Sequence, residues 1–282
     1  LLTCGRVCPH PCEDYCRRGI EEEPVSINQL KRFAADFEMN SGQRFPIPCA
    51  PATGHKVAVV GGGPAGLSAA FFLRRVGHDV TIFEAMPKLG GMIRYGIPEY
   101  RLPKKTLDWE IQGILDLGIE ARTDARMGRD FTMKTLAEEG FEAVFLGIGA
   151  WSDYTLGIPG EDMDGVYTGI NFLSRFAGGE NIPAGKNCVV VGGGNTAIDC
   201  VRTLVRLGAE KVTLLYRRTR KEMPANEVEI EAAEHEGVEY HFLAAPVRVV
   251  GDGNGYATHL EYLKMELGEP DASGRRRPVP IE

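Results

Sequence analysis

The sequence of 282 residues lacks the long apolar runs that membrane-spanning helices require, and no signal-peptide pattern is present. It also lacks a basic excess: the formal net charge is −7, which gives no reason to expect nucleic acid or an anionic membrane surface as a partner. Its six histidines form no ligand or catalytic pattern. With ordinary hydrophobic and charged contents of 43% and 25%, these absences favour a soluble, cytoplasmic enzyme with room for two domains.

Two glycine-rich segments carry the dinucleotide-binding fingerprint. In the first, Gly61, Gly63 and Gly66 have the G-x-G-x-x-G spacing between an apolar strand at residues 57–60 and a helical pattern, and Glu84 ends the next strand. The glycines permit a tight turn, close approach of a pyrophosphate and helix–strand packing, and the helix N-terminus attracts the anion. A carboxylate such as Glu84 accepts hydrogen bonds from a ribose hydroxyl, so this segment predicts an FAD site.

The second fingerprint has Gly192, Gly194 and Ala197 at the same spacing, but its second strand ends differently. Leu215 and Tyr216 stand where the first segment has its carboxylate, and Arg217 and Arg218 follow. Arginines at this point suit a ribose 2′-phosphate, which predicts NADPH. A lone fingerprint is a weak signal, but here both lie between strand and helix patterns. The pair predicts a flavin-dependent pyridine-nucleotide oxidoreductase.

Four cysteines lie within thirteen residues near the start: Cys4, Cys8, Cys12 and Cys16, spaced C-x3-C-x3-C-x3-C. Disulfides belong mainly to secreted proteins and do not suit an enzyme that uses NADPH. Zinc sites usually combine spacings of two to four residues with a distant second pair. Iron–sulfur ligation, which takes four thiolates for each cubane cluster, is the favoured interpretation, with zinc and no metal as the alternatives.

The sequence also lacks a C-x2-C or C-x4-C pair after either fingerprint, which argues against a dithiol–disulfide mechanism. Hydride moves from nicotinamide to flavin when the two rings stack, and the protein supplies position and electrostatics. We therefore predict no catalytic acid, base or nucleophile.

A helix is predicted between residues 26 and 42. The S-x-x-Q pattern from Ser26 to Gln29 is typical of a capping box, and Gly42 is typical of a helix end. The predicted apolar face of this helix consists of Leu30, Phe33, Ala34 and Phe37. The proline-rich stretch 45–51 that follows is a natural linker.

Together, the runs CGRVCPHPCEDYC, PVSINQLKRFAAD, GGMIRYGIPEYRLPK, VVVGGGNTAIDC and YRRTRKEMPA resemble the small (beta) subunit family of NADPH-dependent glutamate synthase. The same module occurs in the N-terminal part of dihydropyrimidine dehydrogenase and in bifurcating transhydrogenase subunits. The resemblance covers essentially the whole chain. It implies an α/β fold with two Rossmann-like domains of the glutathione-reductase type, preceded by a small helical iron–sulfur domain. We accordingly predict an iron–sulfur part at 1–50, an FAD-binding part at 51–155 and an NADPH-binding part at 156–282.

The resemblance also implies a chain of electron carriers. Cys8 and Cys12 match ligands of one [4Fe-4S] cluster and Cys16 matches a ligand of another, while the equivalent of Cys4 need not ligate. Electrons would pass from NADPH through FAD and the clusters to a large catalytic subunit or a ferredoxin-type partner in a hetero-oligomer. In glutamate synthase the product is glutamate, formed from glutamine and 2-oxoglutarate. The alternatives are a bifurcating or ferredoxin-linked NAD(P)H oxidoreductase subunit, or a non-catalytic electron-transfer subunit.

Further site residues follow from the same resemblance. Arg101 resembles a residue that contacts FAD, Met92 would bring its backbone to the flavin, and Met127 would meet the adenine; a surface charge and core methionines are the alternatives. Arg220 would extend the phosphate-binding patch or be a solvated charge. The full predicted cofactor-binding set is Gly61, Gly63, Pro64, Ala65, Gly66, Glu84, Gly91, Met92, Arg101, Met127, Gly149, Gly192, Gly194, Asn195, Thr196, Ala197, Arg217, Arg218 and Arg220, and the predicted metal ligands are Cys4, Cys8, Cys12 and Cys16.

The sequence departs from the family pattern at both ends. An upstream cysteine motif that completes both clusters is not seen before Leu1, and no returning strand with a Gly-Asp pair for the flavin phosphates follows the second fingerprint. We therefore expect an internal part of a longer protein, incomplete at both ends, with cluster and FAD sites that are incomplete as given.

Overall fold

The computed structural model describes residues 1–270, 272 and 274–281 and contains two compact units. One unit is Leu1–Ala150, and the other begins at Trp151. The first contains both the helical segment at the start of the chain and the first nucleotide-binding fold. The predicted three-part division, with borders after residues 50 and 155, stays a prediction.

A four-stranded parallel sheet forms the centre of the first unit. Its order is β3 (Glu120–Arg122), β2 (Asp79–Phe83), β1 (Lys56–Val60) and β4 (Ala143–Leu146). Helices cover both faces, so the strands read as nearly continuous apolar runs. The central position of β1 places the first glycine-rich turn, which follows it directly, at the carboxyl edge of the sheet.

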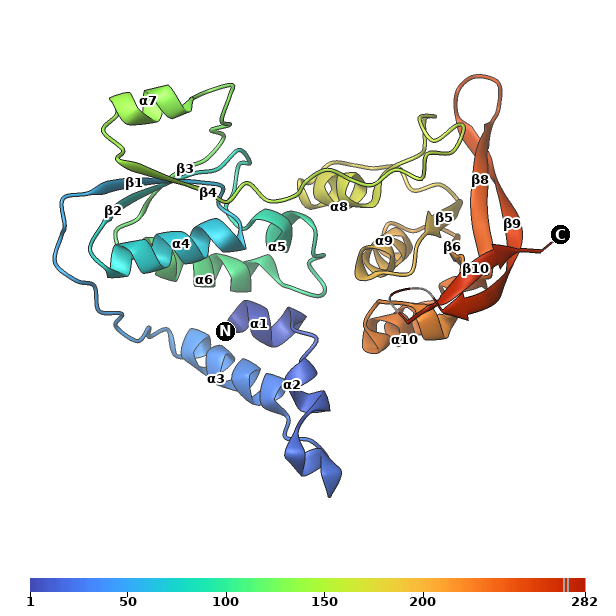
Figure 1. The fold of residues 1–282 in the computed structure, drawn as a ribbon, viewed down its shortest axis with the longest axis horizontal. Helices are drawn as coiled ribbons and strands as arrows, with labels where there is room; N and C mark the ends of the chain where they lie inside the picture. Colours follow the sequence, from blue (N-terminus) through green and yellow to red (C-terminus); the bar gives the residue numbers. More distant parts are fainter. Residues whose placement is uncertain (271, 273, 282) are drawn as a thin grey trace. The chain divides into compact units, whose positions relative to one another are not determined.

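Two hydrophobic clusters lie on the two faces of this sheet. On one face α4 (Pro64–Arg75) and α6 (Lys104–Leu115) pack their side chains onto β1 and β2, and on the other face lies α7 (Met133–Glu138) (Figure 1). The first cluster includes Val59, Leu67, Ala70, Ile82, Leu107 and Ile111, and the second includes Ala58, Val60, Phe83, Phe131, Leu136 and Phe141. Burial of each large aliphatic side chain contributes about 1.5–3 kcal/mol.

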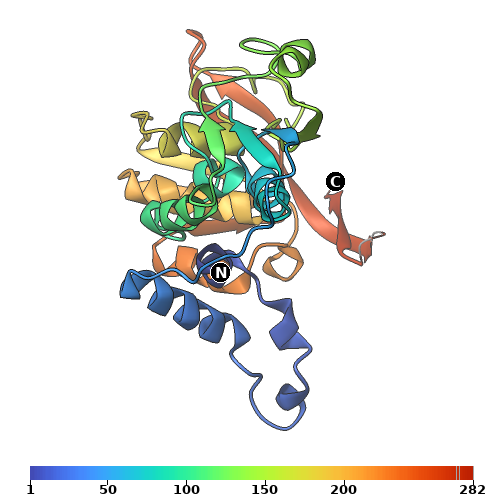
Figure 2. The same ribbon diagram turned by 90° about the vertical axis from the view of Figure 1, so that its left-hand side faces the viewer.

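The cysteine segment forms short helices at the start of the chain, drawn in blue in Figures 1 and 2: α1 (Leu2–Val7), α2 (Pro11–Asp14) and the 3₁₀ turn η1 (Arg17–Ile20). Glu110 of α6 accepts hydrogen bonds from the backbone N–H groups of Leu2 (3.0 Å) and Thr3 (2.9 Å) and from the Thr3 hydroxyl (2.6 Å). These donors are the unpaired groups of a helix start. Glu110 therefore caps α1 and fastens the cysteine segment to the helix layer of the sheet.

Helix α3 (Ile27–Ser41) begins after Ser26 and ends at Gly42, whose φ of +69° confirms the predicted end. The predicted capping box is wrong, because the Ser26 side chain makes no capping hydrogen bond within the described chain. Instead, Glu13 accepts a hydrogen bond from the backbone N–H of Asn28 (2.7 Å).

The predicted apolar face of α3 is exposed within the described chain. Leu30, Phe33 and Phe37 are 60%, 71% and 68% exposed within the described chain, whereas Ala35 is buried. The buried Asn28 donates a side-chain hydrogen bond to the Gly5 carbonyl (3.2 Å). The helix thus meets α1 through small and polar residues, which an apolar periodicity does not reveal.

The second unit contains another parallel sheet, in the order β5 (Asn187–Val191), β6 (Lys211–Tyr216) and β7 (Glu239–Phe242). Helix α9 (Asn195–Arg206) follows β5, and α10 (Glu227–His235) precedes β7. Helix α8 (Gly169–Ala177) packs against α9 through Phe172 and Leu173. The main core of this unit includes Ile198, Val201, Leu214, Ile230 and Ala233.

A long antiparallel ribbon completes the second unit. Its strands are β8 (Ala244–Gly251), β9 (Ala257–Pro270) and the short β10 (Arg276–Pro280), which pairs with β9 (Figures 1 and 2). A 3₁₀ turn, η2 (Arg220–Glu222), follows β6. In the part of the chain that the structure describes, no helix is long and apolar enough to cross a bilayer.

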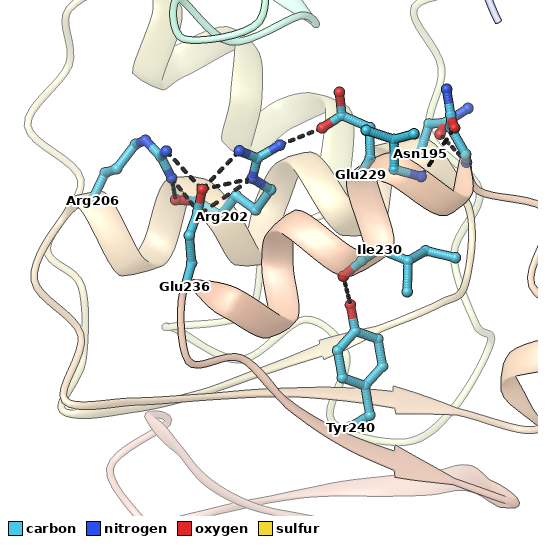
Figure 3. Close-up of polar contacts among 9 residues, drawn as sticks. Asn195, Arg202, Arg206, Glu229, Ile230, Glu236 and Tyr240 are labelled. Atoms are coloured by element: carbon cyan, nitrogen blue, oxygen red, sulfur yellow. Dashed lines mark hydrogen bonds and ion pairs between the residues drawn. The ribbon is translucent and has the colours of Figure 1, made fainter.

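Ion pairs join α9 to α10 (Figure 3). Arg202 pairs with Glu229 and with Glu236 (2.7 Å), and Arg206 pairs with Glu236 (2.6 Å). The guanidinium of Arg206, with that of Arg202, lowers the pKa of Glu236 to about 2. Tyr240 on β7 donates its hydroxyl to the Ile230 carbonyl (3.0 Å). These contacts hold α9, which follows the second glycine-rich turn, against α10, and they hold α10 against β7.

Candidate functional site

The first glycine-rich turn, between β1 and α4, has no space for side chains. Gly61 has a φ of +107°, and a Cβ there would lie 2.3 Å from the Gly147 carbonyl oxygen. A Cβ on Gly66 would lie 1.8 Å from the Gly61 carbonyl oxygen. Pro64 and Ala65, in the first turn of α4, are exposed. The turn therefore presents an accessible helix N-terminus, as a pyrophosphate requires.

Glu84 stands beside this turn. It is only 5% exposed, and its carboxylate accepts hydrogen bonds from the backbone N–H groups of Gly62 (2.7 Å) and Met86 (2.8 Å). Two carboxylate oxygens offer about four acceptor positions, so these bonds fix the group without exhausting it. The carboxylate is thus held where the ribose hydroxyls of a bound dinucleotide are expected.

Another glycine, Gly91, lies against Gly63 of the same turn. A Cβ on Gly63 would lie 3.6 Å from the Cα of Gly91, at the start of α5 (Gly91–Tyr95), and a Cβ on Gly91 would lie 2.7 Å from the Cα of Gly63. Met92 follows in the same helix and is half-buried. The structure therefore brings the predicted FAD residues Gly61, Gly63, Gly66, Glu84 and Gly91 together.

The other predicted FAD residues are more dispersed. Arg101 lies half-buried in the turn that precedes α6, and Met127 packs against the aromatic cluster under α7. Gly149 is exposed after β4, with a φ of +72°. Their contacts with FAD stay predictions. Gly147, which meets both Gly61 and Gly66, was not predicted, although a G-x-G directly after the apolar strand at 143–146 was a signal for it.

The second glycine-rich turn repeats this geometry with one change. The N–H of Gly61 donates to the Phe83 carbonyl (2.7 Å), and the N–H of Gly192 donates to the Leu215 carbonyl (3.0 Å). The next residues, Glu84 and Tyr216, are therefore structurally equivalent. The Tyr216 ring packs on Gly193, where a Cβ would lie 2.7 Å from it, just as the Glu84 carboxylate lies against Gly62. The second turn thus has an aromatic ring where the first turn has a carboxylate.

The helix start of the second turn is open. A Cβ on Gly194 would meet nothing within 4 Å in the described chain, and Asn195 and Thr196 are exposed. Asn195 Oδ1 accepts a hydrogen bond from the backbone N–H of Asn226 (3.0 Å), so its side chain braces α9 against the start of α10. Ala197 is buried against the core. This space suits a pyrophosphate at the N-terminus of α9.

A cavity of about 510 Å³ opens at the carboxyl ends of β5 and β6. This volume lies in the usual range for ligand pockets. The residues that line it are Leu156, Ile158, Val191, Gly192, Leu215, Tyr216, Arg217, Arg218, Pro224, Ala245, Pro246 and Arg275. This described wall contains three arginines and no carboxylate. The cavity is therefore a strongly basic pocket adjoining the second turn.

The three arginines predicted at the nucleotide phosphate differ in their surroundings. Arg217 is exposed in the cavity wall. Arg218 is also in the wall but is 5% exposed, and its Nε donates to the Arg276 carbonyl (2.7 Å). Arg220 is absent from the described wall and pairs with Glu227 and Glu234 of α10. The structure brings Arg217 and Arg218 to the cavity, whereas the predicted role of Arg220 gains no support.

The four cysteines near the start of the chain are free thiols, with Cys4 and Cys12 exposed and Cys8 and Cys16 half-buried. Backbone N–H groups lie 3.4 Å from Cys8 Sγ and 3.5 Å from Cys16 Sγ. Hydrogen bonds from the backbone of Val25 and Arg18 lower the pKa of Cys16, which favours the thiolate that binds metals. However, no three metal-ligating side chains converge among the described residues. The donors suit iron, but the described chain does not assemble a complete ligand set.

Two family models match the chain. Residues 55–271 match the pyridine nucleotide-disulphide oxidoreductase model, and residues 1–43 match that of dihydropyrimidine dehydrogenase domain II, 4Fe-4S cluster. The matches agree with the cofactor prediction: nicotinamide nucleotide and FAD on the two nucleotide folds and [4Fe-4S] at the helical segment.

Curated relatives match over nearly the whole chain. The beta subunit of an NADPH-Fe(3+) oxidoreductase from Geobacter sulfurreducens is 48% identical over 99% of this chain, which spans 42% of that relative. The beta subunit of an NADP(+)-dependent formate dehydrogenase from Moorella thermoacetica is 46% identical over 98% of this chain and 42% of its own length. The glutamate synthase (NADPH) small chain of Escherichia coli is 38% identical over 98% of this chain and 61% of its own length.

Solved structures support the fold alone. FprA from Mycobacterium tuberculosis, solved in complex with NADPH, superimposes with a TM-score of 0.69 at 19% identity. The match covers 82% of this chain and 67% of the other. Thioredoxin reductase from Lactococcus lactis superimposes with a TM-score of 0.55 at 20% identity, over 80% of this chain and 74% of the other.

Proposed function

Because this chain belongs to the pyridine nucleotide-disulphide oxidoreductase family, we propose that it is the electron-input part of a larger NADPH-dependent oxidoreductase. In this proposal the second unit binds NADPH and the first binds FAD and contributes cysteine ligands to [4Fe-4S] clusters. At these positions FAD would supply the ability to take two electrons as a hydride and to pass them on one at a time, as iron–sulfur clusters require.

One observation carries the nucleotide assignment. Glu84 and Tyr216 occupy equivalent places beside the two turns, and only the first is a carboxylate. A carboxylate binds ribose hydroxyls and repels a 2′-phosphate, whereas the residues after Tyr216 are Arg217 and Arg218 in a basic cavity. This difference supports FAD at the first turn and NADPH, in preference to NADH, at the second.

In this proposal the backbone and side chains of this chain bind and orient the cofactors. The glycine turns bring backbone N–H groups to the pyrophosphates, and Glu84 fixes the ribose of FAD. Arg217 neutralises the phosphate that distinguishes NADPH. The four thiols supply ligands of the chemistry that iron–sulfur clusters require. NADPH use and thiol ligation suit the reducing cytoplasm, which we propose as the compartment.

Anaerobic stopped-flow spectroscopy tests this function directly. We expect NADPH to bleach the flavin absorbance of the full-length protein at a rate at least tenfold above that with NADH at equal concentration, which corresponds to about 1.4 kcal/mol. Equal rates with both nucleotides would refute the NADPH assignment, and no bleaching with either would refute the electron-input role in favour of a non-catalytic electron-transfer subunit.

For the partner, we propose a redox subunit other than the large subunit of glutamate synthase. The relatives from Geobacter and Moorella, which are beta subunits of other oxidoreductases, share more identical residues with this chain than the glutamate synthase small chain does. Glutamate synthase is the second candidate, supported by its small chain over 98% of this chain. In both candidates the partner subunit accepts electrons from iron–sulfur clusters within a hetero-oligomer.

Assay of the native complex separates these partners. We expect the complex purified through this subunit to couple NADPH oxidation to a ferric or dye acceptor and to form no glutamate from glutamine and 2-oxoglutarate. NADPH-dependent glutamate formation by the complex would instead establish the second candidate.

A further inference from the structure

The nucleotide cavity of the second unit contains an arginine from a distant part of the chain. Arg275 directly precedes β10 and lies 58 residues after Arg217, yet both line the same cavity. It is half-buried, and it does not belong to the strand–turn–helix segment that carries the fingerprint. The cavity wall therefore joins the Rossmann-like fold to the antiparallel ribbon.

The ribbon is fastened next to Arg275 to the segment that follows β6. Arg218 lies two residues after the end of β6 and donates its Nε to the carbonyl of Arg276 (2.7 Å). The guanidinium of Arg276 in turn donates to the carbonyls of Gly268 (3.0 Å) and Leu267 on β9. Arg276 is thus held by contacts with Arg218 and with β9, and Arg275 is its chain neighbour. This arrangement sets where the Arg275 side chain enters the cavity wall.

The charge of the wall favours a multiply charged anion. Arg217, Arg218 and Arg275 line the cavity, and its described wall holds no carboxylate. An anion with several oxygens can accept charge-assisted hydrogen bonds from more than one of these arginines. A phosphate monoester matches the planar donor groups of arginine.

We propose that Arg275 is a specificity-determining residue that binds the 2′-phosphate of NADPH together with Arg217, and that Arg218 is a positioning residue that holds Arg275 at the cavity. This inference rests on the proposed function and deepens it: selectivity for the phosphorylated nucleotide comes from two separate segments of the chain. The buried Arg218 acts through the carbonyl of Arg276, to which its Nε is bonded.

Calorimetric titration of the full-length protein with adenosine 2′,5′-bisphosphate and adenosine 5′-monophosphate tests the role of Arg275. We expect Arg275→Ala, like Arg217→Ala, to weaken bisphosphate binding roughly 10- to 100-fold and to change monophosphate binding less than about twofold. Arg277→Ala is the matched control, because Arg277 is an exposed arginine of β10 that is absent from the described wall. Arg275→Gln, which keeps most of the side-chain stem, should reproduce the loss if the alanine variant folds poorly.

A double-variant comparison tests the role of Arg218. We expect Arg218→Ala to weaken bisphosphate binding. We expect the Arg218→Ala/Arg275→Ala double variant to have the same affinity as the single variant that binds the bisphosphate less tightly, because Arg218 acts through Arg275. Additive losses would show that Arg218 binds the phosphate itself and would overturn its positioning role.

The outcomes separate this inference from the proposed function. Arg275 variants that behave like Arg277→Ala, or that lose both nucleotides equally, would overturn the role of Arg275 at the 2′-phosphate while NADPH use stands. A wild-type protein that binds the bisphosphate no better than the monophosphate would overturn the NADPH assignment itself.

Discussion

Glu84 illustrates how one buried carboxylate organises a binding turn. Its two oxygens accept hydrogen bonds from Gly62 and Met86, and its side chain is almost fully covered. A carboxylate in this position costs desolvation energy that backbone N–H donors offset. In our proposal the same group also binds the ribose of FAD. Glu84 is thus both a structural residue of the turn and the residue that distinguishes it from the second turn.

We expect Glu84→Gln to lower the FAD content of the full-length protein. The amide nitrogen of glutamine is a donor, so one of the two backbone N–H groups would lose its acceptor, at a cost of about 1–3 kcal/mol. Released-flavin absorbance and thermal unfolding measure the two effects. Glu139→Gln, an exposed glutamate of the same unit, is the control, and an unchanged flavin content in Glu84→Gln would show that the ribose is held elsewhere.

The cysteines form the second set of residue-scale expectations. In the full-length protein we expect Cys8→Ala and Cys12→Ala to remove the iron and sulfide of one cluster, Cys16→Ala to affect another cluster, and Cys4→Ala to have the least effect. Iron analysis and low-temperature electron paramagnetic resonance distinguish the clusters. Cys49→Ala, an exposed lone thiol, is the control. Loss of one and the same cluster in all four variants would contradict the shared-ligand interpretation.

At the scale of the element, the pairing of α9 with α10 depends on pH through Glu236. The pKa of Glu236 is about 2 in the folded chain, well below its usual value near 4.5, because Arg206 and Arg202 bind its carboxylate. A depressed pKa in the folded state stabilises the protein at pH values above the usual pKa. That contribution is lost as pH falls from about 4.5 through about 2, since protonation removes both ion pairs.

We therefore expect Glu236→Gln to destabilise the protein at pH 7 by about 1–2 kcal/mol, a value reduced for the screening of a partly exposed pair. The difference from wild type should shrink as the pH falls from 4.5 towards 2. Chemical denaturation across this range measures it. Glu239→Gln removes an exposed ion pair with Lys211 and should change stability by less than about 1 kcal/mol. A pH-independent difference for Glu236→Gln would contradict the ion-pair explanation.

The elements also show which structural features the sequence determines locally. The first glycine turn was predictable because a Cβ at Gly66 collides with the carbonyl of Gly61 in the same turn, and a Cβ at Gly61 collides with the carbonyl of Gly147, directly after the adjoining strand β4. The end of α3 at Gly42 was predictable for another local reason: its φ of +69° lies in the left-handed region that favours glycine, and a Cβ there would meet nothing within 4 Å in the described chain. In contrast, the outward face of α3, with Phe33 and Phe37 exposed, depends on which neighbours are present, and periodicity alone does not report them.

The binding site shows the same division. Arg217 could be predicted because it follows the second strand of a recognisable fingerprint. Arg275 could not, because its place in the cavity depends on the long ribbon that brings the start of β10 back to Arg218. Arg220 was predicted from its neighbours in the sequence, but Glu227 and Glu234 on α10 bind it instead. Residues whose roles depend on tertiary pairing carry no local sequence signal.

On the scale of the whole molecule, each unit contains one glycine-rich turn on its own parallel sheet. The two turns differ in the groups beside them. Glu84 lies beside the turn of the first unit, and a cavity lined by three arginines adjoins the turn of the second unit. The cysteine helices belong to the first unit through the contact of Glu110 with α1.

The Glu110 contact has a consequence for the order of events during synthesis. Helix α1 has six residues, fewer than an isolated helix needs to persist in water, and its capping carboxylate lies 107 residues beyond Thr3. At roughly 5–20 residues per second, the ribosome produces Glu110 several seconds after the first cysteines. A nascent chain therefore carries unsupported thiols during that interval. The capped form of α1 therefore requires that α6 has already been synthesised.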